Sequence, residues 1–284
     1  MGKLLVRLAI GALFAIFGLF NYLTTVSENP ITGERQRVAL TPQEEIVLGQ
    51  QGGQEVVQQF GGLYPDPALQ SYLDQVGQQV VSRSIAGQSP YPFEFHLLND
   101  PNTVNAFALP GGQIFVTTGL LSRLTAESQL AGVLGHEVGH VIARHGSEHL
   151  ARQQLGVALV NAIGVASSSD DPSGGQQAAM IAQAVNQLVN LNYGRQDELE
   201  SDRLGFDFMT AAEYNPEGLV ELMEILDKAT QGGRQPEFFS SHPNPGNRVE
   251  RLETLIQETY PQGVPPELEE GEQDFSQVVQ PRLR

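Results

Sequence analysis

The chain has 284 residues, with 33 acidic against 16 basic side chains and a formal net charge of −17. Such an acidic surface repels phosphate groups, which argues against nucleic acid as a partner. The chain has no cysteine, which excludes disulfides, thiolate metal ligands, cysteine catalysis and a lipid anchor on cysteine.

The amino-terminal segment 1–27 has the pattern of a signal peptide or a single membrane anchor. Lys3 and Arg7 precede an apolar run over residues 8–23, as in a secretory signal. The run is borderline in length for a membrane span, and residues 25–27 are small but form no Ala-x-Ala cleavage site. Positive charges before the run favour a body outside the cytoplasm. We expect an extracytoplasmic protein (periplasm or cell envelope) that contacts the membrane only through this segment, with an uncleaved anchor preferred to a cleaved signal.

Residues 28–260 are expected to form one domain of the α+β class, mostly helical with a small sheet beside the central helix. Periodicity and turn residues place the elements in order. Helices are predicted over 42–60, 67–83, 125–146, 150–165, 176–191, 195–209, 216–229 and 246–260, strands over 92–98 and 113–117, and a loop over 167–175. Residues 261–284 are rich in proline and glutamate, which predicts a flexible acidic tail.

A His-Glu-x-x-His motif, from His136 to His140, indicates a metal centre. Residues four apart lie on one face of a helix, so both imidazoles can bind the same ion. Glu137 is then placed to take a proton from a water on that metal. The alternative is an exposed amphipathic helix with two surface histidines.

The sequence around the motif favours the metal centre. Thr125 is expected to be the N-cap of the helix and Gly146 to end it. Gly135 and Gly139 would weaken a plain surface helix, and we expect them to let another element approach closely.

The third ligand is expected from the helix predicted at 195–209. Glu198 and Asp202 lie four apart, so one carboxylate can bind the metal while the other accepts the N–H of a ligand histidine. Glu200 points elsewhere and ranks below Glu198; the alternative is a solvated acidic helix face. His145 and His149 fall away from the face of the motif histidines, and we expect both to be solvated.

These motifs resemble the zinc metallopeptidases of the CAAX-prenyl-protease type, family 48 among the gluzincins, and in particular their single-domain bacterial periplasmic or membrane-anchored members. The E-x-x-x-D motif of Glu198 to Asp202 follows the His-Glu-x-x-His motif in the family's order. Three further stretches match: Asn-Ala-Phe-Ala-Leu-Pro-Gly-Gly from 105, Ser-His-Pro-Asn-Pro-Gly-Asn-Arg from 241, and Asn-Pro-Ile-Thr-Gly-Glu-Arg from 29. The resemblance spans residues 28–257.

The resemblance implies a zincin-like domain with one Zn²⁺ per chain. It makes His136, His140 and Glu198 the zinc ligands, Glu137 the general base, and Asp202 the carboxylate that supports a ligand histidine.

The resemblance also implies that Asn105 and Ala106 belong to a strand beside the active site, where the substrate backbone binds. An edge strand can take up an extended peptide by strand addition. The alternative is an ordinary hairpin in which Asn105 is a turn residue.

His242 and Arg248 are further candidates. The resemblance places His242 near the metal, either to stabilise the oxyanion of the transition state or to bind zinc as a fourth ligand that closes the resting site; the alternative is a surface loop histidine. Arg248 either pairs with an active-site carboxylate or is an ordinary helix cation.

Two functions follow from these observations. The first is an endopeptidase that uses a metal-activated water to hydrolyse polypeptide substrates, expected to be unfolded or misassembled cell-envelope proteins. The second is a membrane-tethered, chaperone-like binding module with a latent or structural zinc. Glu137 favours the first, because a structural zinc site has no use for a general base.

Overall fold

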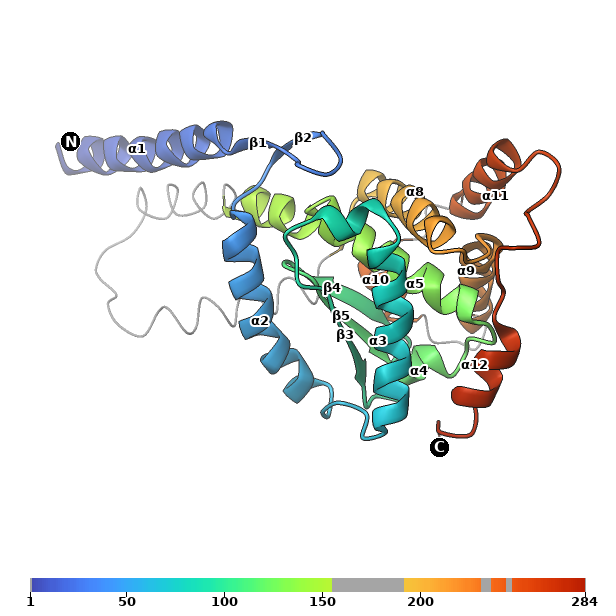
Figure 1. The fold of residues 1–284 in the computed structure, drawn as a ribbon. Helices are drawn as coiled ribbons and strands as arrows, with labels where there is room; N and C mark the ends of the chain where they lie inside the picture. Colours follow the sequence, from blue (N-terminus) through green and yellow to red (C-terminus); the bar gives the residue numbers. More distant parts are fainter. Residues whose placement is uncertain (1, 155–191, 231–235, 244–246, 284) are drawn as a thin grey trace.

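The computed structural model describes residues 2–154, 192–230, 236–243 and 247–283. Helices dominate it and a small sheet lies among them (Figure 1), which confirms the predicted mostly helical α+β class. The helices are α1 (Gly2–Thr24), α2 (Pro42–Gln59), α3 (Pro67–Ser82), the 3₁₀ helix η1 (Ile85–Gln88), α4 (Thr118–Leu121), α5 (Glu127–Ile142), α8 (Arg195–Ala211), α9 (Glu217–Thr230), α10 (Phe238–Ser241), α11 (Arg248–Thr259) and α12 (Glu272–Val278). Residues 145–154 are also helical. The predicted loop 167–175, the helix 176–191 and most of the helix 150–165 lie outside the described residues.

The described strands form a hairpin and a three-stranded sheet. The hairpin pairs β1 (Val26–Glu28) with β2 (Arg35–Arg37). In the sheet, β5 (Gln113–Thr117) is central, parallel to β3 (Glu94–Leu98) and antiparallel to β4 (Ala106–Leu109). β4 therefore lies at an edge of this sheet.

Local sequence accounts for the first helices of the domain. The Thr41 hydroxyl accepts the Glu44 N–H, and the Glu44 carboxylate accepts the Thr41 N–H at 2.8 Å, which completes a capping box before Pro42. Asp66 caps α3 by accepting the N–H groups of Ala68 and Leu69. Both helices have proline in the first turn, where no N–H is needed.

The core forms where the sheet meets α3, α5, α8 and α9. α5 packs against α3, α8, α9 and the strands β4 and β5, while α2 also contacts β4 and β5. Every residue of α5 after Glu127 is buried. The small sheet thus lies beside the central helix, as predicted.

The prediction of a flexible tail from 261 is wrong for the part that forms α12. Phe275 is fully buried and Val279 nearly so, and α12 packs against α5 and α3. The two apolar residues lie four apart, so they share one helix face and anchor a segment whose other residues are mostly polar.

The segment expected to contact the membrane forms α1. It exposes large apolar side chains; among them Leu13, Ile16, Phe17 and Phe20 are each more than 60% exposed. Among the described residues, no helix combines the length and apolar character that crossing a bilayer requires.

Candidate active site

The helix that carries the His-Glu-x-x-His motif is shorter than predicted. It begins at Glu127 after Ala126, and Thr125 does not cap it. It ends at Ile142, before the predicted Gly146, because Arg144 takes a left-handed conformation with φ 59°. Glu45 holds Arg144 there by accepting from its Nε at 3.1 Å, and the Leu40 carbonyl accepts from its Nη2 at 2.6 Å. This buried ion pair ends the helix at a residue type that rarely adopts the left-handed region.

The predicted close approach at Gly135 and Gly139 is confirmed, and the approaching element is α8. A Cβ on Gly135 would lie 3.1 Å from the Gly205 carbonyl oxygen, and one on Gly139 would lie 3.1 Å from the Ser201 Cα. A Cβ on Gly205 would lie 2.9 Å from the His136 nitrogen. Small residues on both helices therefore bring the two motif-bearing backbones together.

We expect Gly205→Ala to destabilise the protein by about 1–3 kcal/mol, because the added methyl forces α5 and α8 apart. Urea unfolding of the metal-free protein measures the change. Arg203→Ala, an exposed side chain on the same helix, is the control and should stay within about 0.5 kcal/mol of the parent. Equal stability of the two variants would contradict this packing.

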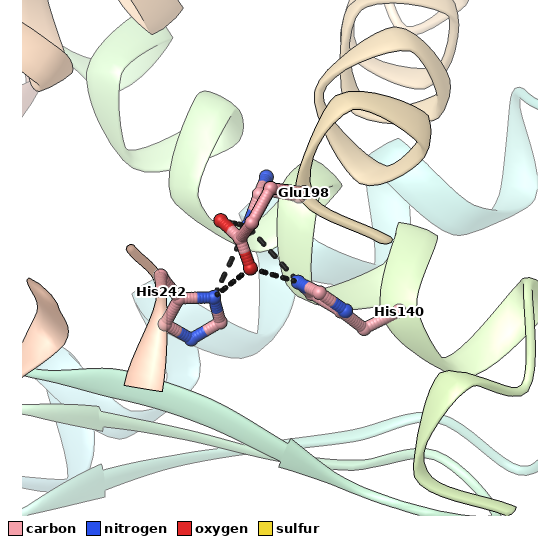
Figure 2. Close-up of side chains that lie close together, drawn as sticks. His140, Glu198 and His242 are labelled. Carbon is pink, nitrogen blue, oxygen red and sulfur yellow. Dashed lines mark hydrogen bonds and ion pairs between the residues drawn. The ribbon is translucent and has the colours of Figure 1, made fainter. Parts of the chain in front are cut away.

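Four side chains from three parts of the chain converge beneath this crossing. His136 and His140 come from α5, Glu198 from α8, and His242 from the end of α10; all four are buried, with ligand atoms within 4.8 Å of one another. Figure 2 shows Glu198 between His140 and His242. Nε2 of His140 lies 3.1 Å from Nε2 of His136, and Nδ1 of His242 lies 3.1 Å from Oε1 of Glu198.

These separations fit one zinc ion. Donors bound to a tetrahedral zinc at about 2.0–2.1 Å lie about 3.3 Å from each other. The remaining close pairs are 3.4 Å for His136 Nε2 and His242 Nδ1, 3.4 Å for His140 Nε2 and Glu198 Oε1, and 3.6 Å for His136 Nε2 and Glu198 Oε2. Nitrogen and oxygen donors of this kind suit zinc.

Asp202, which pairs with Arg248, contacts the side of the His136 ring that faces away from the cluster. Nδ1 of His136 lies 3.0 Å from Oδ1 of Asp202, which leaves Nε2 directed into the cluster. Arg248 is fully buried and donates to both carboxylate oxygens of Asp202, at 2.7 and 2.5 Å. Its Nη1 also lies 2.8 Å from Oε2 of Glu198. The positive charge of Arg248 therefore compensates the negative charges of two carboxylates that are buried close to each other.

Glu137 lies next to the cluster without belonging to it. Its side chain is fully buried, and neither carboxylate oxygen has a hydrogen bond within the described residues. Burial raises the pKa of Glu137, against the charges of His242 and His136. Nε2 of His242 lies 3.5 Å from Oε1 of Glu137.

His140 and Glu198 have the charge states that metal binding needs. Burial holds the pKa of His140 well below its usual value, so the imidazole is neutral and can act as a ligand. Burial alone would raise the pKa of Glu198, but the charge of His242 and hydrogen bonds from His140 and His242 outweigh it and lower this pKa.

Asn105 and Ala106 lie outside this cluster. Asn105 is buried immediately before β4, and its N–H donates to the Thr117 hydroxyl at 3.2 Å. Its side-chain Oδ1 has no hydrogen bond within the described residues. Ala106 is the first residue of the edge strand β4, which packs against α5.

Sequence reasoning missed three groups around the motif. His145 is buried against His140, so the prediction that it is solvated is wrong. His149 is half-buried and bonded to Asp197, so it is not simply solvated either. The Tyr193 ring stacks on His140 at 3.9 Å between centroids, and no motif signals it.

The Asn-Pro-Ile-Thr-Gly stretch from 29 contacts the carboxyl end of α5. The Asn29 side chain accepts the N–H groups of Ile31 and Thr32 and donates to the Ile142 carbonyl at 2.7 Å. Gln36 donates to the Ala143 carbonyl. The β1–β2 hairpin therefore satisfies carbonyls that the end of α5 leaves free.

A His-Glu-x-x-His helix packed against a second helix that places a glutamate in the same buried cluster is the arrangement of a metallopeptidase domain. A family model, Peptidase family M48, matches residues 67–256. The chain therefore belongs to peptidase family M48, which confirms the resemblance noted from its motifs and the expectation of a metalloendopeptidase.

Curated relatives agree with this assignment. The chain is 31% identical over 255 residues to the mitochondrial metalloendopeptidase OMA1 of Schizosaccharomyces pombe, covering 87% of this chain and 71% of that protein. It is 32% identical over 213 residues to the beta-barrel assembly-enhancing protease of Escherichia coli, covering 72% of this chain and 43% of that protein. It is 28% identical over 264 residues to the mitochondrial metalloendopeptidase OMA1 of Homo sapiens, covering 87% of this chain and 48% of that protein. The chain thus spans less than half the length of the last two.

Proposed function

We propose that this protein is a zinc endopeptidase that cleaves unfolded or misassembled proteins of the cell envelope. The observation that carries the proposal is a buried Glu137 carboxylate, without a hydrogen bond to any described residue, beside four side chains spaced for one zinc. Zinc, when bound, would lower the pKa of its water and polarise the scissile carbonyl.

The side chains divide the work in this proposal. His136, His140 and Glu198 hold the ion, and Asp202 orients His136. Glu137 takes the proton of the attacking water and delivers it to the leaving amine. Burial raises its pKa, which suits a carboxylate that must accept a proton as well as release it.

The edge strand β4 supports a polypeptide substrate. β4 is hydrogen-bonded only to β5 within the described sheet, so its other side can pair with an extended peptide. A chain must be locally unfolded to bind in this way. We propose that the backbone next to Asn105 and Ala106 receives it.

The cell-envelope location rests on the sequence of the amino terminus and on the relatives' names. Lys3 and Arg7 precede an apolar segment, as in exported proteins. One relative is named for beta-barrel assembly and others as mitochondrial.

Cleavage of unfolded casein by the purified full chain tests this function. Zinc-loaded protein should release defined peptides, a zinc chelator should stop the reaction, and added zinc should restore it. A folded protein of similar size should resist. Zinc-loaded protein that cleaves no unfolded substrate, while binding one zinc, would support the alternative of a latent binding module.

Whether His242 binds zinc determines whether the metal keeps a position open for water. Nδ1 of His242 lies 3.4 Å from Nε2 of His136 and 3.1 Å from Oε1 of Glu198, close to the spacing of donors on one zinc, and a fourth protein ligand leaves no open position for water. We therefore propose that His242 is the resting-state ligand. His242→Ala is expected to raise cleavage of casein several-fold and to weaken zinc binding.

The same variant tests the other role of His242. If it stabilises the oxyanion, His242→Ala should instead lower kcat by about 10²–10³-fold and leave zinc affinity unchanged. His96→Ala is the matched control, because His96 lies on β3 and bonds to Gln113 rather than to the cluster.

A further inference from the structure

His145 lies directly behind the second motif histidine. Its Nδ1 is 2.9 Å from Nδ1 of His140, and its Nε2 is 3.2 Å from Oε2 of Glu200. Nε2 of His140 points the other way, into the metal cluster. A continuous chain of contacts therefore runs from the cluster through two imidazoles to a carboxylate on α8.

The contacts fix which nitrogen carries each proton. If Nε2 of His140 binds the metal, the proton of its neutral ring is on Nδ1 and is donated to Nδ1 of His145. His145 then carries its own proton on Nε2 and donates it to Glu200. Each donor meets one acceptor, and the negative charge of Glu200 is passed on to the metal ligand by hydrogen bonds.

Side chains from two other parts of the chain fix the backbone around His145. Arg144 is fixed in its left-handed conformation by Glu45. The hairpin side chains of Asn29 and Gln36 bond to the carbonyls of Ile142 and Ala143. The turn that returns His145 to His140 is therefore built by contacts from α2 and from the β1–β2 hairpin.

We propose that His145 and Glu200 are positioning residues that orient His140 and raise its affinity for zinc. The inference deepens the proposed function, on which it rests, and gives each motif histidine its own support. His136 is bonded directly to Asp202, whereas His140 reaches its carboxylate through a second imidazole. Partners of this kind typically change metal affinity by about 10–100-fold.

A neighbouring pair on the same two segments provides a matched control. Nε2 of His149 lies 2.7 Å from Oδ2 of Asp197. This pair also joins the segment after α5 to α8, but His149, which lies in the helical residues 145–154, has no hydrogen bond to a cluster residue among those of the described chain. Substitution of His149 therefore measures the effect of losing an interaction between these segments without removing a contact of a proposed zinc ligand.

Zinc dissociation constants of the full-length protein, measured by competition with a chromogenic chelator, test the proposal without any peptidase assay. We expect His145→Ala and Glu200→Gln to weaken zinc binding about 10-fold or more, and His149→Gln to change it less than about 3-fold. With Co²⁺ in place of zinc, only the first two should shift the visible absorption bands. Glu200 is partly exposed, so Glu200→Gln keeps the test valid if His145→Ala fails to fold.

The outcomes are distinct. Parent protein that binds zinc tightly, with Glu200→Gln and His145→Ala no weaker than His149→Gln, would overturn this inference alone. Parent protein that binds no zinc would overturn it together with the proposed function.

Discussion

Replacing Glu137 by glutamine is expected to lower kcat for peptide hydrolysis by about 10²–10⁴-fold, the range that a general base contributes. Glutamine has the same shape and cannot accept a proton. The Glu137 carboxylate makes no hydrogen bond within the described residues, so the change removes no side-chain hydrogen bond and should leave folding and zinc content as they are. Initial rates on casein, with zinc measured in the same samples, give the comparison.

Glu127→Gln is the control for this substitution. Glu127 lies on the same helix but accepts hydrogen bonds from Tyr72 and Tyr214, far along α5 from the motif. It should retain the parent kcat in the folded protein. A Glu137→Gln variant with undiminished kcat would refute the assignment of Glu137 as the base.

Replacing Arg248 by methionine is expected to cost about 3–5 kcal/mol of stability, the effect of removing one partner from a buried ion pair. Methionine keeps much of the length of the side chain but leaves Asp202 and Glu198 without their shared cation. The charge of Arg248 lowers the pKa of Asp202, against the effect of burial. This share of the stability is present above the usual pKa of an aspartate and is lost as the pH falls through the lowered value.

Chemical unfolding of the metal-free protein at neutral and acidic pH measures this effect. Arg203→Met removes an exposed cation whose partner is Asp207, and it should cost no more than about 1 kcal/mol. The gap between the two variants should narrow at acidic pH, where Asp202 becomes protonated. A cost for Arg248→Met no larger than that of the control would contradict the role of Arg248.

The faces of α5 and α8 that meet in the buried cluster could be predicted because helix geometry is periodic. His136 and His140 must share a face of any helix, and so must Glu198 and Asp202. Gly135 and Gly139 also predicted that another element packs closely against α5, although the sequence did not show that this element is α8. These inferences need only local spacing.

The missed features depend on contacts between distant segments. Arg144 ends α5 because Glu45, almost a hundred positions earlier in the chain, pairs with it, and no local pattern shows this. His145 was expected to be solvated because an uninterrupted helix would carry it away from His140. The left-handed conformation of Arg144 instead turns the chain so that the His145 side chain contacts His140. Likewise, α12 is anchored by two apolar residues in a stretch of polar composition.

X-ray absorption at the zinc edge of the full chain tests the central claim most directly. The structure predicts one zinc per chain with four nitrogen and oxygen donors at about 2.0–2.1 Å, three of them imidazoles from His136, His140 and His242. The imidazole signal should fall by one third in His242→Ala. A zinc shell of six oxygens without imidazole scattering, or no bound zinc, would contradict the account.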